Sequence, residues 1–198
     1  MTARVTAPGL RERKKARTRD AIRAAAMRLF TERGYDATTV EQIAEAAEVS
    51  PSTFFRYFPT KERVVLADDL DAPTLAALTA IPLDVPPLTA FRQAFETTLA
   101  AMSPEQLHLE TARNQLLLAV PALRAAFTDE LYRSIDMAAA VIAERQGTPP
   151  DDRVRVLAGA MIGAVVAMVE TAPDDLRYAI RALELLEGTL ASQAPDPR

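Results

Sequence analysis

Hydroxyl and cationic side chains gather in one short run of this chain, Ser-Pro-Ser-Thr-Phe-Phe-Arg-Tyr-Phe-Pro-Thr-Lys at residues 50–61. Small polar residues at the start of a short helix can reach base edges in the major groove of DNA. Ser52 and Thr53 meet that requirement. Arg56 follows one turn later and could reach a guanine edge or a phosphate. The run therefore predicts a DNA-reading helix.

Two earlier helices would position this run. Apolar residues at helical spacing predict a long helix over residues 10–33, stopped by Gly34. Thr39-Val-Glu-Gln forms a capping box that opens a second, short helix, whose N-terminal amides could hold a phosphate. A tight turn at residues 47–50 then leads to a third helix, which starts with proline and covers residues 51–58. This arrangement is a helix-turn-helix unit.

The net charge of −4 hides a strong asymmetry. Residues 1–63 carry 13 Lys or Arg and 8 Asp or Glu, whereas residues 64–198 carry 10 and 19. A basic head on an acidic protein indicates that the head meets a polyanion and the body does not. We expect Arg17, at the start of the first helix, and Tyr57 and Lys61, at the end of the third, to face the DNA backbone.

The rest of the chain shows nearly continuous helical periodicity and no strand alternation of useful length. Prolines, glycines and capping residues predict a helix from Lys61 that bends near Pro73. Further helices are predicted over residues 87–102, 104–119, 121–146, 151–171 and 173–192. The fold class is therefore all-α, with about nine helices. Residues 1–60 form a three-helix head, and residues 61–198 form a helical bundle.

The helix at residues 151–171 is apolar on nearly all sides, so we expect it to be buried on more than one side. Its apolar stretch covers only about two-thirds of a membrane span, which favours a buried helix in a cytoplasmic protein. Gly159 and Gly163 would let a second backbone approach closely, from within the chain or from a second copy. The stripe from Leu176 to Leu190 supplies a matching apolar surface.

The head resembles the signature of the TetR family of one-component regulators at Thr39, Ile43-Ala44, Ala47, Val49-Ser50, Ser52-Thr53-Phe54-Phe55, Tyr57-Phe58 and Lys61-Glu62. The resemblance covers about the first third of the chain. It implies that residues 51–57 are the recognition helix, and that the bundle holds a ligand pocket and a dimer interface in its last two helices. The run at residues 54–62 is similar to the branch that includes fatty-acyl-CoA-responsive and mycofactocin-associated regulators.

Three residues depart from the family's pattern. Glu48 stands where the family usually has glycine, so a left-handed turn residue there costs about 1 kcal/mol or the turn differs. Phe55 replaces a tyrosine whose hydroxyl meets a phosphate in relatives, and Tyr57 replaces a histidine and could restore one such contact. The expected DNA-binding residues are Arg17, Thr39, Ser50, Ser52, Thr53, Phe55, Arg56, Tyr57 and Lys61.

The ligand-binding candidates of the bundle are large apolar residues and one cation. They are Phe91, Phe95, Met102, Arg113, Leu116, Phe127 and Met161. Core packing also accounts for each apolar member. Arg113 lies on an apolar stripe, where an unpaired cation is costly. It either pairs with a carboxylate such as Glu110 or Glu96, or it meets an acidic ligand.

An enzyme is disfavoured, because the chain has no Cys, one His, no Gly-rich phosphate loop and no carboxylate pair in a plausible cleft. No metal or other cofactor is expected. The main hypothesis is a homodimer that occupies a near-palindromic operator in double-stranded DNA until a small hydrophobic effector, such as a fatty acyl-CoA, releases it. The alternative is a ligand-independent DNA-binding protein of the same fold that acts through protein contacts, which a closed bundle would favour.

Overall fold

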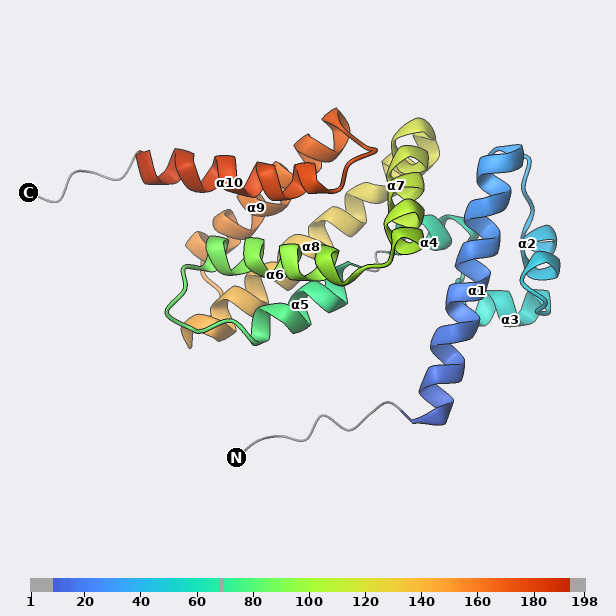
Figure 1. The fold of residues 1–198 in the computed structure, drawn as a ribbon, viewed down its shortest axis with the longest axis horizontal. Helices are drawn as coiled ribbons and strands as arrows, with labels where there is room; N and C mark the ends of the chain where they lie inside the picture. Colours follow the sequence, from blue (N-terminus) through green and yellow to red (C-terminus); the bar gives the residue numbers. More distant parts are fainter. Residues whose placement is uncertain (1–8, 68–69, 193–198) are drawn as a thin grey trace, which may run out of the picture. The chain divides into compact units, whose positions relative to one another are not determined.

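The computed structural model describes residues 9–67 and 70–192. These two ranges form ten α-helices without a strand, which confirms the all-α fold class. The chain divides into two compact units, Met1–Val65 and Leu66–Arg198 (Figure 1). The helices are α1 (Leu10–Arg33), α2 (Val40–Ala46), α3 (Pro51–Tyr57), α4 (Lys61–Leu66), α5 (Asp71–Thr79), α6 (Pro87–Ala101), α7 (Pro104–Ala119), α8 (Pro121–Gln146), α9 (Asp152–Thr171) and α10 (Arg177–Ser192).

The first unit is built on α1, against which α2 packs, and α3 packs in turn on α2. Its most buried side chains come from all three helices, with Ile22, Ile43 and Phe54 fully removed from solvent. Gly34 ends α1 with a φ of +86°, and its N–H donates to the Phe30 carbonyl. Burial of apolar residues from three helices fixes how α3 is presented.

The second unit contains α5 to α10. In it α9 packs between α8 and α10, α10 also packs on α6, α5 packs on α6, and α7 packs on α8 (Figure 1). A central cluster includes Leu88, Ile142, Ala158, Met161 and Leu183. The core therefore joins residues that are far apart in the sequence.

Two predicted boundaries differ from the structure. The single bent helix expected after Lys61 is two helices, α4 and α5, and Pro73 lies in the first turn of α5, where its missing N–H costs no hydrogen bond. The last helix begins at Arg177 rather than 173, because the Asp175 carboxylate accepts the Arg177 N–H at 3.0 Å.

The end of α5 is held by a side chain from α8. Arg145 donates to the carbonyl oxygens of Leu78, Ile81 and Pro82 at 2.8, 3.0 and 2.9 Å. The last carbonyls of a helix have no partners within the helix and carry partial negative charge. Arg145 therefore fixes α5 against α8.

The apolar helix α9 is the one described helix whose length and composition would allow it to cross a membrane. Its buried residues are Val154, Ala158 and Met161. The expectation of burial on more than one side is met only in part within a single chain, because Ile162, Val166 and Val169 on another face are half-buried. One face of α9 is in the core, and the other faces are not.

Candidate nucleic-acid interface and effector cavity

The turn between α2 and α3 contains a residue with left-handed backbone conformation that is not glycine. Glu48 has a φ of +54°, its N–H donates to the Glu45 carbonyl at 3.0 Å, and the Val49 N–H donates to the Ala44 carbonyl at 2.9 Å. This pair of bonds is a Schellman motif, in which glycine is the usual left-handed residue. The departure at Glu48 therefore leaves the turn unchanged and adds a conformational cost of about 1 kcal/mol.

Helix α3 has a buried face and an exposed face. Phe54 and Phe58 are buried, with ring centroids 6.1 Å apart, whereas Ser52, Phe55 and Arg56 are exposed. Phe55 leaves 49% of its surface in solvent, a large exposed area for an aromatic residue. The exposed face thus carries three of the predicted DNA-binding residues, whereas two others, Thr53 and Tyr57, are half-buried.

Three hydroxyl groups meet at the N-terminus of α3. Ser50 is the N-cap, and its hydroxyl accepts the Thr53 N–H at 3.2 Å. The same hydroxyl lies 2.9 Å from the Ser52 hydroxyl and donates to the Thr53 hydroxyl at 3.0 Å. These hydrogen bonds hold the hydroxyl groups of Ser52 and Thr53 in place at the N-terminus of α3. At the N-terminus of α2, Thr39 is exposed and completes the predicted capping box with Gln42.

Lys61 is engaged within the head. Its ammonium donates to the carbonyl oxygens of Tyr35 and Thr38 at 2.9 and 3.1 Å, and it lies 4.1 Å from the centre of the Tyr35 ring. Burial, and then the nearby Glu62 carboxylate, raise the pKa of the Tyr35 hydroxyl well above its usual value. Lys61 therefore joins the start of α4 to the connection between α1 and α2, in addition to any phosphate contact.

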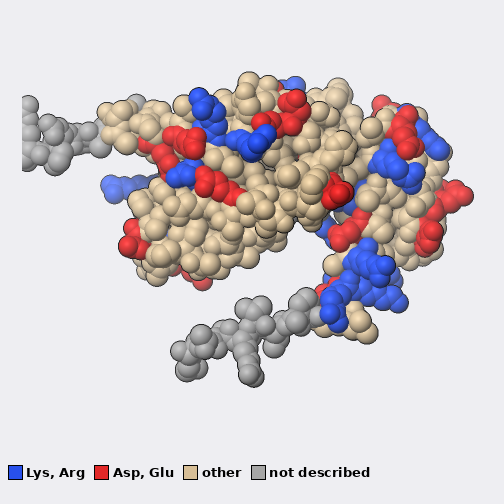
Figure 2. All heavy atoms as spheres, in the orientation of Figure 1, with Lys and Arg blue, Asp and Glu red and all other residues tan. Residues whose placement is uncertain are grey.

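The first turns of α1 carry a dense group of cations, visible in Figure 2. Arg17 is exposed there, as are Arg11, Arg13, Lys14 and Lys15. Further along the head surface, the Arg56 guanidinium lies 5.3 Å from the centre of the Tyr57 ring. The basic character predicted for the head is thus concentrated on solvent-exposed side chains.

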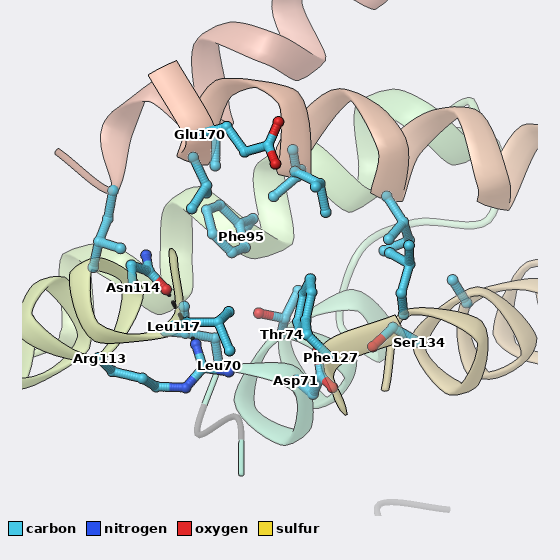
Figure 3. A pocket seen from close by; sticks show the side chains of 18 of the residues that line it. Leu70, Asp71, Thr74, Phe95, Arg113, Asn114, Leu117, Phe127, Ser134 and Glu170 are labelled. Carbon is cyan, nitrogen blue, oxygen red and sulfur yellow. Dashed lines mark hydrogen bonds between the residues drawn. The ribbon is translucent and has the colours of Figure 1, made fainter. Parts of the chain in front are cut away.

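The second unit contains a cavity of about 160 Å³ between α5, α6, α7, α8, α9 and α10 (Figure 3). It has 23 lining residues, most of them apolar. The polar ones are Asp71, Thr74, Arg113, Asn114, Arg124, Ser134 and Glu170. An apolar cavity with few polar groups is typical of a small-molecule site.

Four of the seven predicted ligand-binding residues line this cavity, namely Phe91, Phe95, Arg113 and Phe127. The other three predictions do not fit it. Met102 lines a second cavity, of about 280 Å³, between α5, α6 and α7. Met161 is fully buried in the core, because the cavity face of α9 is the stripe that includes Ile162, Val166 and Val169. Leu116 is displaced from the cavity, since α7 turns Asn114 and Leu117 toward it.

Several lining residues were not predicted from the sequence, above all Arg124 and Glu170. Arg124, Phe127, Leu131 and Ser134 recur at helical spacing along α8. That stripe includes Phe127, and its extension by one turn would have reached Arg124. Glu170 continues the apolar stripe of α9 by one turn beyond Val166 in the same way.

Both cations of the lining face a carboxylate. Arg113 lies 3.7 Å from Glu110 and donates to the Asn114 side chain at 3.2 Å, so the structure pairs it within the protein. Both side chains of this pair are nearly fully buried, and loss of one partner from a buried pair costs about 3–5 kcal/mol. Arg124 lies 3.0 Å from Glu170, but this pair is exposed and contributes about 0–1 kcal/mol.

A third face of α9 is open. A Cβ added at Gly159 or Gly163 would meet no atom of the described residues within 4 Å, so neither glycine serves close packing within that part of the chain. Val156 leaves 71% of its surface exposed, and Leu185 on the adjacent α10 leaves 53%. Large apolar residues exposed on two packed helices are typical of a protein contact.

Two family models match the chain in succession. The one for bacterial regulatory proteins of the tetR family matches residues 22–67, and the one for the MftR C-terminal domain matches residues 85–192. The HTH-type transcriptional regulator TcmR of Streptomyces glaucescens is 42% identical over 158 residues, 75% of this chain and 69% of that protein. RutR of Escherichia coli K12, also an HTH-type transcriptional regulator, is 31% identical over 149 residues, 70% of this chain and 66% of that protein.

Solved structures show the same arrangement of helices. A structure of Thermus thermophilus FadR, a transcriptional repressor in complex with lauroyl-CoA, has a TM-score of 0.51 at 29% identity, covering 91% of this chain and 99% of that one. A transcriptional regulator from Rhodococcus sp. Rha1 has a TM-score of 0.52 at 18% identity, covering 91% and 99%. The second likeness is one of fold alone.

Proposed function

The chain belongs to the TetR family of bacterial regulatory proteins, and from this we propose that it is a homodimeric repressor that an amphipathic acid releases from its operator. Membership makes it a DNA-binding transcriptional regulator and confirms the expectation that it is not an enzyme. The identity of the effector, the release step and the site residues are parts of the proposal. We place its action in the cytoplasm, where its DNA lies.

The observation that carries the proposal is the cavity of the second unit. Its walls are largely apolar, and its lining includes three aromatic rings, those of Phe91, Phe95 and Phe127. Burial of an alkyl chain against such walls gives affinity in proportion to the apolar area removed from water. A bundle with an internal cavity favours ligand-relieved repression over the ligand-independent alternative, which a closed bundle would have favoured.

A fatty acyl compound is the effector class that these walls suit best. The polar members of the lining are few, so a bulky polar ligand would lose hydrogen bonds to water without replacing them. One comparison supports the class. The FadR structure of similar fold holds lauroyl-CoA, and it covers 91% of this chain. Our proposal is therefore a fatty acid or its CoA thioester.

In this proposal two copies meet through α9 and α10. The open face of α9, with Val156, Ala160 and Gly163, would lie against its counterpart, together with Tyr178 and Leu185 of α10. Two recognition helices in such a dimer must lie about 34–36 Å apart to enter successive major grooves of a near-palindromic operator. An effector that binds one spacing better than the other shifts the equilibrium toward release.

The test starts with selection of an operator from a random DNA pool. Release of a labelled operator duplex is then followed by fluorescence anisotropy while lauroyl-CoA, coenzyme A alone or the cationic dye crystal violet is added. We expect release at micromolar lauroyl-CoA and none with coenzyme A. A Ser134→Phe variant, which fills the cavity from α8, should bind the operator and resist release.

Each result has a distinct meaning. Release by the dye and not by the acyl compound would show that the effector class is wrong. An operator complex that resists every added compound would favour the ligand-independent alternative.

A further inference from the structure

The cavity has two cations in its lining, Arg113 and Arg124, and they differ in how readily they can accept an acid. Arg113 and its partner Glu110 leave 4% and 3% of their side chains exposed. An acid that drew Arg113 away would leave the Glu110 carboxylate buried beside a weakened partner, which is strongly unfavourable. Arg113 is therefore committed to the protein.

Arg124, unlike Arg113, can exchange its carboxylate partner for an acidic ligand at little cost. Its side chain is 62% exposed and that of Glu170 is 47% exposed, with 3.0 Å between the guanidinium and the carboxylate. A carboxylate displaced from an exposed pair is rehydrated at once, so the exchange costs little. An arginine also binds a carboxylate or phosphate through two parallel hydrogen bonds.

The positions of Arg124 and Glu170 give the cavity a polar end. Arg124 lies in the first turn of α8, and Glu170 lies in the last turn of α9. Figure 3 shows Glu170 and Arg113 on opposite sides of the cavity. From Arg124 the lining continues along α8 to Ala138, which is ~21 Å of helix at 1.5 Å per residue.

We propose that Arg124 is the anchor for the anionic group of the effector, and that Glu170 is the competing carboxylate which this group displaces. The alkyl chain then lies along the apolar stripes of α8 and α9, with its far end toward Ala138 and Ile162. This inference rests on the proposed effector class and deepens it, because it names the residue that distinguishes an acid from a neutral lipid. The anionic group is a carboxylate in a free acid and a phosphate in a CoA thioester.

Direct binding tests the anchor without an operator. Calorimetry with laurate, lauroyl-CoA and dodecanol compares one chain with three head groups. We expect the wild-type protein to prefer laurate and lauroyl-CoA over dodecanol by about tenfold or more, which corresponds to about 1.4 kcal/mol. Arg124→Gln should abolish this preference and leave the affinity for dodecanol unchanged. Glu170→Gln should strengthen the binding of both anions several-fold.

A matched control lies on the same helix. Arg133 is also exposed and paired with a neighbouring carboxylate, but it does not line the cavity, so Arg133→Gln should bind all three compounds as the wild type does. The buried pair is tested with the double variant Arg113→Met and Glu110→Leu, which removes both charges together and so strands neither. This variant should keep the preference for laurate.

The outcomes separate the anchor from the effector class. A wild type that binds all three compounds equally, or an Arg124→Gln variant that still prefers the anions, overturns the anchor and leaves the effector class in place. Loss of the preference in the double variant alone would move the anchor to Arg113. A wild type that binds none of the three overturns both proposals.

Discussion

Replacement of Lys61 by methionine distinguishes a structural role of this lysine in the head from a role in DNA contact alone. Lys61→Met keeps most of the stem and removes the ammonium that donates to the carbonyls of Tyr35 and Thr38. A lysine that merely met a phosphate would weaken DNA binding without changing the head. The contacts in the structure predict instead that Lys61→Met destabilises the head, and that any loss of DNA affinity follows from this.

The magnitude follows from the three contacts. A hydrogen bond from a charged donor contributes about 1.5–3 kcal/mol, and the lower value applies because Lys61 is only partly buried. The position of the ammonium 4.1 Å from the Tyr35 ring centre adds about 0.5–1 kcal/mol. We expect the variant to lose about 2–3 kcal/mol of head stability after partial replacement of these contacts by water.

Hydrogen exchange followed by mass spectrometry measures this loss locally, which matters because two compact units need not unfold together. Amides near Tyr35 and Thr38 should exchange faster in Lys61→Met, while amides in α8 and α9 should not change. Lys15→Met removes the same charge from an exposed site on α1, and its exchange pattern should match that of the wild type.

The salt dependence of binding to a mixed-sequence duplex gives the second readout. Each phosphate contact that is lost lowers the slope of log affinity against log salt by about 0.9. Variants of the exposed cations on α1 should lower the slope, whereas Lys61→Met should lower affinity with a nearly unchanged slope. Unchanged exchange in Lys61→Met together with a slope lower by about 0.9 would refute the structural role.

Three other variants follow from the structure. In thermal melts, Glu48→Gly should stabilise the head by ~0.5–1 kcal/mol, because relief of the cost of a left-handed backbone at this position exceeds the entropy that glycine adds to the unfolded chain. Glu48→Ala keeps a side chain at the left-handed position, so it should show no gain in the same melts. Folding raises the pKa of the Tyr35 hydroxyl, so the stability that the protonated hydroxyl contributes is complete below the ordinary tyrosine pKa of about 10 and is lost at higher pH. In urea unfolding, Tyr35→Phe should therefore lose less stability at alkaline pH than the wild type does. Arg145→Gln should cost ~2–4 kcal/mol through three lost hydrogen bonds, whereas Arg155→Gln, in an exposed pair with Asp136, should cost ~0–1 kcal/mol by urea unfolding.

The helices of the head could be predicted from local signals. Thr39 and Ser50 accept backbone N–H groups of their own helices, and Pro51 starts a helix where its missing N–H has no consequence. These effects join residues only three or four positions apart, so the local sequence is enough to recognise them. Lys61 is different, because its acceptors Tyr35 and Thr38 lie more than 20 residues away.

The cavity could be predicted only in part for the same reason. Periodicity identifies the apolar face of a helix but not the neighbour that this face meets. Met161 and Val166 are both apolar residues of α9, yet the first is in the core and the second lines the cavity. The ion pair of Arg124 with Glu170 joins residues 46 positions apart, which no local pattern indicates.

Helix α9 links the two halves of the proposed mechanism. Its cavity face carries Ile162, Val166 and Val169, and its open face carries Ala160 and Gly163. A packed helix moves as a unit, because displacement of one face would otherwise open voids along its core face. An alkyl chain that pushes on the cavity face must therefore move the small residues of the open face.

Small side chains let two backbones approach closely, so a slight shift of α9 changes the contact between two copies more than it would through long, adaptable side chains. We infer that this is why Ala160 and Gly163 lie on the open face of α9, and that Ala160→Leu would weaken the dimer and, with it, operator binding without changing the affinity for laurate. Light scattering and calorimetry on that one variant decide the point, since a dimer of unchanged strength would show that the copies meet elsewhere.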